Sequence, residues 1–340
     1  MGTILVTGGT GYVGSHVIPG LVDRGHHVVV FDNLHRGHLS SIDHFGIEFF
    51  EGDLNDNQAL RTLFSLHRFD AILHFAALAY VGESVFSPDL YYRVNVAGML
   101  NLLESALHAN PSQLPPFVFS SSCSVFGVPD RLPLGESSAK LPISPYGRSK
   151  LVGEWLLTDF GQAFGLRSVV LRYFNAAGAD LRNGLGERHL PETHLIPLAI
   201  AAARGGSPLT LFGADFDTPD GSAIRDFIHV RDLADAHLLA LDHLLAGGCS
   251  QDFNLGTGSG VSVRELVQAV ETELQAKVPT REAPRRPGDP AALVCDPTKA
   301  QHILGWKPKR SSLNKIVADA AAWDQSNNTY NTQELNHVSA

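Results

Sequence analysis

The stretch Thr7–Gly14, TGGTGYVG, joins an apolar run at Ile4–Thr7 to a segment of helical period at Tyr12–Arg24. Gly8, Gly11 and Gly14 in this stretch recur at intervals of three residues. Glycines at this spacing between a strand and a helix permit a tight turn and let a pyrophosphate approach the helix N-terminus. A turn that binds nothing is the alternative, but the flanking strand and helix favour a dinucleotide-binding turn.

The pattern of the first half repeats this alternation of short apolar runs with longer segments of helical period. The expected strands are Ile4–Thr7, Val28–Phe31, Ile47–Glu51, Ala71–Phe75, Phe117–Ser120 and Ser168–Arg172. The expected helices are Tyr12–Arg24, Asn57–His67, Ser87–Ala109 and Ser144–Phe164. Strands that alternate with helices predict an α/β fold, a doubly wound parallel sheet of the Rossmann type with helices on both faces.

Beyond Asn175 the alternation gives way to connections rich in glycine and proline, which predict a smaller mixed α/β substrate lobe. We therefore expect a nucleotide-binding domain at residues 1–175, a lobe at 176–323 and a frayed polar tail at 324–340. Strands at Phe227–His229 and Asp252–Leu255, with a helix at Val230–Leu245, are expected to return to the main sheet. Ser262 and Glu265 have capping-box spacing and predict a helix that ends near Gln275.

Composition limits the classes of partner. The 340-residue chain has a formal net charge of −9, which argues against broad binding of nucleic acid or of an anionic membrane. Its three cysteines are scattered and no CxxC or HExxH spacing is present, so we expect neither disulfides nor a structural metal. The first predicted strand leaves no room for a signal segment, so a cytoplasmic protein is expected.

Two carboxylates follow predicted strands where a cofactor would lie. Asp32 ends the second strand eighteen residues after Gly14, where it can accept hydrogen bonds from ribose hydroxyls and repel a 2′-phosphate. This position favours NAD over NADP, although a turn or capping aspartate is the alternative. Asp53 follows the third strand and is placed to reach the adenine edge or to cap a helix.

A tyrosine and a lysine four residues apart, Tyr146 and Lys150, lie on one face of a predicted helix. An ammonium beside the phenol would favour its ionised form, and a base near neutrality needs a downward pKa shift of about three units. Ser122 ends the fifth strand, at the sheet edge where α/β proteins present reactive groups. Together these residues predict proton transfer coupled to hydride transfer.

Several blocks, met in order, show a resemblance to a known family: GGTGYVGSH at 8–16, VGES at 81–84, YGRSK at 146–150, LRYFN at 171–175, RDFIHV at 225–230 and RRPGD at 285–289. The chain resembles the extended short-chain dehydrogenases from about Thr3 to Trp306, and within them the nucleotide-sugar 4-epimerases that interconvert UDP-galactose and UDP-glucose. The resemblance implies tightly retained NAD, a UDP-sugar substrate and a homodimer built on the helices Ser87–Ala109 and Ser144–Phe164.

The same resemblance assigns residues to roles. It implies catalysis by Ser122, Tyr146 and Lys150. For the cofactor it implies Gly8, Gly11, Tyr12, Val13, Gly14, Asp32, Asn33, Leu34, Asp53, Leu54, Phe75, Ala76, Ala77, Asn95, Tyr146, Lys150, Tyr173 and Phe174. For the substrate it implies Ser122, Tyr146, Asn175, His194, Leu195, Leu211, Phe212, Arg225, Phe227, Arg286, Asp289 and Leu293. Arg225 and Arg286 are expected to pair with the diphosphate, and surface ion pairs with Asp226 and Asp289 are the alternative.

The family's mechanism implies that Tyr146 takes the proton from the sugar O4 while hydride passes to NAD, with a 4-keto sugar that turns over before hydride returns. Three departures bear on it: Ala79 where a lysine is common, Phe126 where a tyrosine is common, and Leu293 at the position that gates the sugar pocket. Activity on UDP-xylose and UDP-arabinose, or on UDP-N-acetylglucosamine, is therefore an alternative. Cys123 and Ser124 stand where a 4,6-dehydratase needs its acid and base, and a non-catalytic dinucleotide sensor is a remote alternative.

Overall fold

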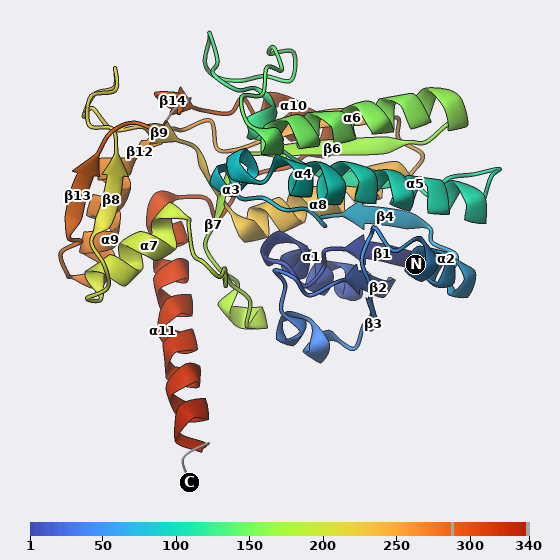
Figure 1. Ribbon diagram of the computed structural model, residues 1–340, viewed down its shortest axis with the longest axis horizontal. Helices are drawn as coiled ribbons and strands as arrows, with labels where there is room; N and C mark the ends of the chain where they lie inside the picture. Colours follow the sequence, from blue (N-terminus) through green and yellow to red (C-terminus); the bar gives the residue numbers. More distant parts are fainter. Residues whose placement is uncertain (287–288, 338–340) are drawn as a thin grey trace.

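The computed structural model describes residues 1–286 and 289–337, with the side chains of residues up to 326. A parallel sheet of seven strands forms its centre, in the order β11-β6-β5-β4-β1-β2-β3 (Figure 1). The strand bounds are β1 Thr3–Thr7, β2 His27–Asp32, β3 Glu48–Glu51, β4 Ala71–His74, β5 Phe117–Ser122, β6 Ser168–Tyr173 and β11 Gln251–Leu255. The order reverses between β1 and β4, which confirms the doubly wound α/β fold and creates a crevice at their carboxyl ends.

Helices cover both faces of this sheet because the strands are apolar on both. Ile4 and Val6 face one core with α1 (Tyr12–Asp23), α8 (Val230–Leu245) and α10 (Thr298–Leu304). Leu5, Val29 and their neighbours face the other core with α2 (Asn57–Leu66), α5 (Gly98–Ala109) and α6 (Pro145–Phe164). Successive residues point to opposite faces of a strand, so a continuous apolar run is what a doubly covered strand requires.

The long helix predicted at Ser87–Ala109 is confirmed, since the backbone is helical without a break from Pro88 to Ala109, but it contains a π-helical turn that the sequence did not predict. The structure has α3 (Val81–Phe86) and α4 (Pro88–Tyr92), then a π-helical segment at Arg93–Ala97, and only then α5. The widened turn carries Asn95, whose amide is buried against the backbone of Leu78. Helical period alone does not reveal such a turn, because the apolar pattern continues through it.

A smaller lobe follows β6, as the glycine and proline content predicts. It contains the parallel pair β8 (Leu209–Phe212) and β13 (Thr280–Ala283). It also contains a three-stranded sheet of β12 (Val261–Ser262), β9 (Ile224–Arg225) and β14 (Ala292–Leu293). These strands share a core with α7 (Leu195–Ala203), α9 (Val263–Leu274) and the first part of α11 (Leu313–His337). Short 3-10 turns lie at Leu39–Ser41, Asp43–Phe45, Cys123–Val125 and Leu181–Asn183.

The capping box that opens α9 is confirmed. The amide of Glu265 donates to Ser262 Oγ at 3.0 Å, and the amide of Ser262 donates to Glu265 Oε2 at 2.7 Å. Gln275 ends the helix in a left-handed conformation with φ 51°. Reciprocal bonds of this kind satisfy two backbone donors that a helix start would otherwise leave free.

The return to the main sheet is confirmed for β11 and α8 but not for β10 (Phe227–His229). β11 pairs in parallel with β6 at one edge of the sheet. β10 instead pairs with β7 (Asn175–Ala177), outside the seven strands. The two edges of β6 are already occupied by β5 and β11, so the chain that leaves β6 forms a separate two-stranded sheet with β10.

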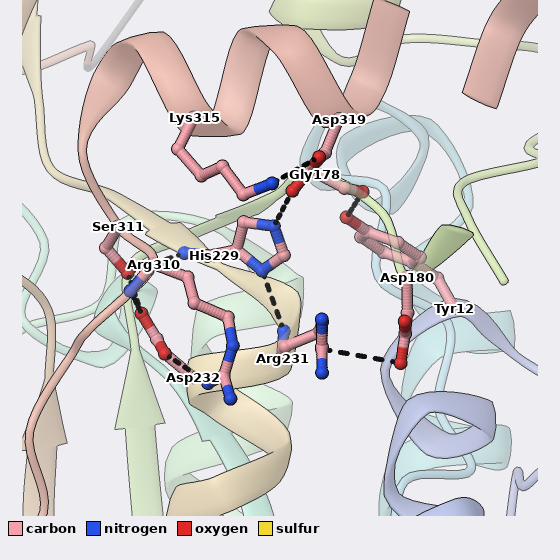
Figure 2. Close-up of polar contacts among 10 residues, drawn as sticks. All are labelled: Tyr12, Gly178, Asp180, His229, Arg231, Asp232, Arg310, Ser311, Lys315 and Asp319. Atoms are coloured by element: carbon pink, nitrogen blue, oxygen red, sulfur yellow. Dashed lines mark hydrogen bonds and ion pairs between the residues drawn. The ribbon is translucent and has the colours of Figure 1, made fainter. Parts of the chain in front are cut away.

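Polar contacts at the start of α8 hold three distant segments together (Figure 2). His229 is fully buried; its Nδ1 accepts from the amide of Arg231 at 3.1 Å, so its Nε2 donates to Asp319 of α11 at 3.0 Å. Asp232 accepts from Arg310 and Ser311 in the segment that leads into α11. The C-terminal helix is thereby fixed to the helix that covers the main sheet.

The tail predicted to fray from Asp324 is instead helical up to His337. Helix α11 projects away from the body of the molecule (Figure 1). Trp323 is buried, and its indole donates to the carbonyl of Glu187 at 2.9 Å. An anchored start lets the backbone continue without a helix-breaking residue. Residues 338–340 lie outside the described residues. No helix in the described part of the chain combines the length and apolar character that a bilayer span requires.

Candidate active site

The glycine turn lies at the crevice where the strand order reverses. Gly8 has φ +71°, and a Cβ there would stand 2.4 Å from the backbone nitrogen of Ala76 after β4. A Cβ at Gly14 would stand 2.3 Å from the carbonyl oxygen of Gly8. Both positions therefore exclude any side chain, because the atoms in the way are backbone. At Gly11 a Cβ would stand 3.3 Å from the carbonyl oxygen of Gly8, which is a tight contact but a less severe one.

Helix α1 begins at this turn with its backbone amides free of side-chain caps. Gly11 is the N-cap, no side chain caps the helix, and no acidic residue lies in its first turn. Tyr12 is turned away from this end, since its hydroxyl donates to the carbonyl of Gly178 at 2.6 Å. Free amides and the positive end of a helix dipole attract anions, so the turn and Val13 behind it suit a pyrophosphate.

The predicted ribose and adenine residues meet at the ends of β2 and β3. The buried carboxylate of Asp32 accepts from the amides of Thr10 at 3.1 Å and Leu34 at 2.9 Å. It therefore also plays the turn role that the sequence left as an alternative. Asn33 donates to Asp53 Oδ2 at 2.7 Å; burial opposes ionisation of Asp53, but hydrogen bonds from Asn55 and Asn33 lower its pKa. Leu54 is buried beside this pair.

The chain after β4 is held rigidly beside the glycine turn. The amides of Phe75 and Ala76 both donate to the carbonyl of Thr7, at 2.9 and 3.1 Å, and Ala77 follows them. Asn95 binds both backbone groups of Leu78 and donates to Ser149 Oγ at 2.9 Å. Its amide is thus used to position the loop against α6, a role that the family resemblance did not suggest.

The structure brings the predicted base and its serine together. Tyr146 is the second residue of α6, and Ser122 ends β5. Both are buried, and Tyr91 lies edge-on to the phenol ring with centroids 6.4 Å apart. Burial raises the pKa of Tyr146 well above its usual range, while a hydrogen bond with Ser122 acts in the opposite direction. To act as a base near neutral pH, this buried phenol therefore needs a larger downward pKa shift than the about three units that an unperturbed tyrosine needs.

The predicted effect of Lys150 on the phenol is not what the structure shows. The ammonium donates to the carbonyl of Ser120 at 2.8 Å and lies 5.1 Å from the centre of the Phe119 ring. Burial lowers the pKa of Lys150 to about 7, so the amine is only partly charged at neutral pH. Helical spacing places the two residues on one face but does not aim the longer side chain at its neighbour.

A buried charge network next to these residues escaped the sequence analysis. Glu154 accepts from Ser121 Oγ at 2.8 Å and forms a bidentate pair with Arg172, at 2.7 and 2.9 Å. Arg172 also pairs with Asp252 of β11 at 2.7 Å. In the sequence, Glu154 follows Lys150 by four residues on the same predicted helix. This spacing places Glu154 on the face of Lys150 and could have indicated the network. The network fixes α6 against β5, β6 and β11, and so sets where the reactive face of α6 stands.

The predicted sugar-gating residue lies in an apolar wall next to the phenol. Leu293 packs against a buried cluster that includes Cys123, Phe126 and Phe174. Asn175 lies at the start of β7, and its side-chain amide donates to the carbonyl of Asp226 at 3.0 Å. This leaves the carbonyl oxygen of that side chain without a bond to the described residues. The side chains of this wall are apolar, so they cannot hydrogen-bond a sugar and hold it in one orientation.

The two arginines predicted at the diphosphate differ in their surroundings. Arg225 forms an ion pair with Asp289, as the alternative from the sequence allowed. Asp226 is not an ion-pair partner: it is fully buried and accepts from the amides of Thr257, Gly258 and Cys295. Arg286 stacks on Phe212, with its guanidinium carbon 3.9 Å from the ring centre. Pro287 and Gly288 of the same motif lie outside the described residues.

The remaining predicted substrate and cofactor residues are spread over the lobe and the sheet edge. His194 is the N-cap of α7 and Leu195 its first residue; although burial opposes protonation, hydrogen bonds with Glu187 and Glu192 raise the pKa of His194 to about 10. Leu211 and Phe227 are buried in β8 and β10. Tyr173 ends β6, and its hydroxyl accepts from Ser120 at 3.0 Å.

Comparison with known proteins decides the family. Residues 4–256 match the model of the NAD dependent epimerase/dehydratase family. The chain belongs to this family. A UDP-glucose 4-epimerase of Rhizobium meliloti is 48% identical over 326 residues, which cover 96% of this chain and 98% of that protein. Membership of the NAD dependent epimerase/dehydratase family makes NAD the cofactor.

Solved structures of the NAD dependent epimerase/dehydratase family agree with the fold. A UDP-glucose 4-epimerase from Brucella ovis in complex with NAD has a TM-score of 0.90 at 47% identity, covering 95% of this chain and 98% of that chain. A UDP-glucose-4-epimerase from Stenotrophomonas maltophila with bound NAD and formylated UDP-arabinopyranose has a TM-score of 0.91 at 39% identity, covering 97% of this chain and all of that chain. The predicted α/β architecture is therefore that of the family.

Proposed function

We propose that this protein is a UDP-glucose 4-epimerase, an isomerase that interconverts UDP-galactose and UDP-glucose. The observation that carries the proposal is the buried pair of Tyr146 and Ser122 at the carboxyl end of β5, on the same edge of the parallel sheet as the glycine turn that follows β1. Relatives of this name match over nearly their full length, such as 98% of the Rhizobium meliloti protein. Proton transfer and a dinucleotide cradle in one crevice are what reversible oxidation of a sugar hydroxyl requires.

In the proposed mechanism Tyr146 withdraws the proton from the sugar O4 and later returns it. Bound NAD supplies the hydride acceptor and donor at C4. Ser122 holds the sugar hydroxyl next to the phenol, and the amine of Lys150 is fixed at the end of β5 by the carbonyl of Ser120. The 4-keto sugar must expose its other face before hydride returns, which the apolar wall around Leu293 permits because it offers few directional contacts.

The anchoring contacts belong to the nucleotide in this proposal. Arg225 and Arg286 present guanidinium groups whose planar fork matches diphosphate oxygens. Arg225 exchanges Asp289 for the substrate, and Arg286 needs no such exchange because it is stacked on Phe212. Strong contacts to UDP with weak contacts to the hexose let the sugar turn while the substrate stays bound.

The decisive experiment is interconversion by purified protein without added cofactor. We expect wild type to convert UDP-galactose to UDP-glucose, and Tyr146→Phe to lose activity by about 100-fold or more, because general base catalysis typically contributes that much. Tyr92→Phe is the matched control, since Tyr92 is partly exposed on α4 away from the crevice. Unaltered turnover by Tyr146→Phe would overturn the proposal and favour a non-catalytic dinucleotide sensor.

Activity on other UDP-sugars is a second candidate function, supported by the residue at position 293. Leucine at position 293 is smaller than the tyrosine that some relatives carry there, so we expect an N-acetyl group on C2 to be partly tolerated. The Stenotrophomonas maltophila structure carries a UDP-pentose derivative. The same assay with UDP-arabinose and with UDP-N-acetylgalactosamine, run at equal concentration, ranks the three sugars by kcat/KM. We expect the hexose to rank first.

We also propose a homodimer and a cytoplasmic location. Large apolar side chains are exposed on α3 and α6, with Phe86 89% and Trp155 58% exposed. Apolar surface of this kind on neighbouring helices is typical of an interface. Equilibrium sedimentation is expected to give a dimer at micromolar concentration and a monomer for Trp155→Glu.

The proposed cytoplasmic location is supported by the cysteines. Cys123, Cys249 and Cys295 are free thiols, which suit a reducing compartment.

A further inference from the structure

Four potential metal ligands converge in the connection that leads into α7, residues 186–194, here called the strap. Glu187, His189, Glu192 and His194 each present one ligand atom, and these atoms lie within 4.8 Å of one another. Two imidazoles and two carboxylates supplied by eight consecutive positions form a compact set. None of the roles proposed above for catalysis uses Glu187, His189 or Glu192.

The contacts point at a common centre. Glu187 Oε1 lies 2.9 Å from Nδ1 of His189 and 2.6 Å from Nδ1 of His194. Glu192 Oε1 lies 2.9 Å from the same nitrogen of His194. One ring nitrogen thus faces two carboxylate oxygens, although it carries at most one hydrogen to share between them.

The two carboxylates of this cluster pair with histidines alone among the described residues. Within the described residues, no lysine or arginine forms an ion pair with Glu187 or Glu192. The Glu187 side chain is only 8% exposed. Buried charges are paired or coordinate metals, and protonated imidazoles are the only cations at hand.

We propose that the strap binds one divalent transition-metal ion, with Zn²⁺ as the preferred ion. Imidazole nitrogen and carboxylate oxygen are both zinc ligands, at about 2.0–2.2 Å. Tetrahedral ligands at those distances stand about 3.4 Å apart. On binding, ligand atoms of the cluster that lie closer together than this distance move apart, and those that lie farther apart approach each other. Small side-chain rotations provide both changes. The expectation of no metal rested on CxxC and HExxH spacing, and the pattern E-x-H-x2-E-x-H is neither.

Surrounding aromatic rings hold the two histidines in place. Tyr80 lies edge-on to His189 with centroids 5.8 Å apart and is tilted against His194 at 6.2 Å. Tyr12, the first residue of α1, lies edge-on to His189 at 6.1 Å. A narrow polar cleft separates the strap from the glycine turn, with Gly11 and Ser15 on one side and Gly186 and His189 on the other. Zinc would therefore stiffen the segment that lies beside the glycine turn and leads into α7.

The test uses full-length protein stripped with EDTA and exchanged into metal-free buffer. We expect calorimetric titration with ZnCl2 to give one ion per chain, with micromolar or tighter affinity. Co²⁺ is expected to give the visible absorption of a tetrahedral site. Zinc at about 100 times its Kd is expected to raise the Tm by about 4 °C. These readouts do not depend on catalytic activity.

Variants assign the ion to the strap. We expect His189→Gln and Glu192→Gln each to weaken zinc binding by about tenfold or more and to remove the cobalt absorption. His108→Gln, at an exposed position on α5, is the matched control and should bind as wild type. Circular dichroism and NAD content show whether each variant is folded. Failure of wild type to bind zinc, or equal binding by wild type and both strap variants, would overturn the proposal.

Discussion

At the scale of single residues, burial of neutral histidines makes stability depend on pH. Burial lowers the pKa of His237 and of His16 to about 4, and that of His74 to about 3, from the ordinary 6.5. Between pH 6.5 and 4 the unfolded chain binds protons that the native chain refuses, so acid favours unfolding. From pH 7 to pH 5 each histidine is expected to remove about 2 kcal/mol from the free energy of unfolding.

The variant His237→Phe tests this at one site. The ring packs against Phe75 with centroids 4.7 Å apart, so phenylalanine keeps the contact and removes the titration. Urea unfolding at pH 7 and pH 5 is expected to show a loss smaller by about 2 kcal/mol than in wild type. His108→Gln serves as the exposed control and should keep the wild-type difference. An unchanged pH difference in His237→Phe would contradict the assignment of this histidine as neutral.

The sequence could predict which residues meet in the crevice, but not what their polar atoms bind. Gly8, Gly14 and Asp32 stand where the strand and turn pattern places them, because backbone geometry at a strand end decides their position. The orientation of Lys150 depends on a carbonyl thirty positions away at Ser120. The Glu154–Arg172 pair likewise depends on the packing of α6 over β6. Contacts between residues this far apart in the sequence leave no local sequence pattern from which they could be predicted.

At the scale of elements, the glycine turn is expected to be intolerant of even one methyl group. In Gly14→Ala the new Cβ would meet the carbonyl oxygen of Gly8 at 2.3 Å and Cα of Gly9 at 3.0 Å, and neither backbone atom can retreat cheaply. The turn must open, with a loss of about 1–3 kcal/mol in stability. We expect the purified variant to carry much less NAD per chain, measured after heat release, and to unfold at lower urea.

Gly82→Ala is the matched substitution in another helix. A Cβ there meets nothing within 4 Å, and the residue lies inside α3. Alanine favours helix by about 1 kcal/mol over glycine, so this variant should be as stable as wild type or slightly more. NAD content equal in Gly14→Ala and Gly82→Ala would show that the turn does not cradle the cofactor.

The elements that the sequence predicts well are those with a full period of pattern. The strands of the main sheet and helices α1, α2, α6 and α8 fall within two residues of their predicted bounds, because long apolar runs and caps such as Ser144 mark them. Strands of two residues, such as β9, β12 and β14, carry too little pattern to recognise. The π-helical turn at Arg93–Ala97 places Asn95 against the backbone of Leu78. The helical period of the sequence carries no information about such a tertiary contact.

At the scale of the whole molecule, Trp323 is expected to couple the C-terminal helix to the strap. Its indole lies beneath Gly186, where a Cβ would come within 2.4 Å of the ring, and it donates to Glu187 while Arg188 lies 5.2 Å from its face. Trp323→Ala leaves a large buried void and should lower the free energy of unfolding by about 3–5 kcal/mol. Because the strap flanks the glycine turn, the variant should also lose NAD several-fold faster on dilution. Leu66→Ala, at an exposed position on α2, is the control and should change neither the free energy of unfolding nor the rate of NAD loss. A Trp323→Ala protein that loses stability but releases NAD at the wild-type rate would show that α11 is not coupled to the cofactor site.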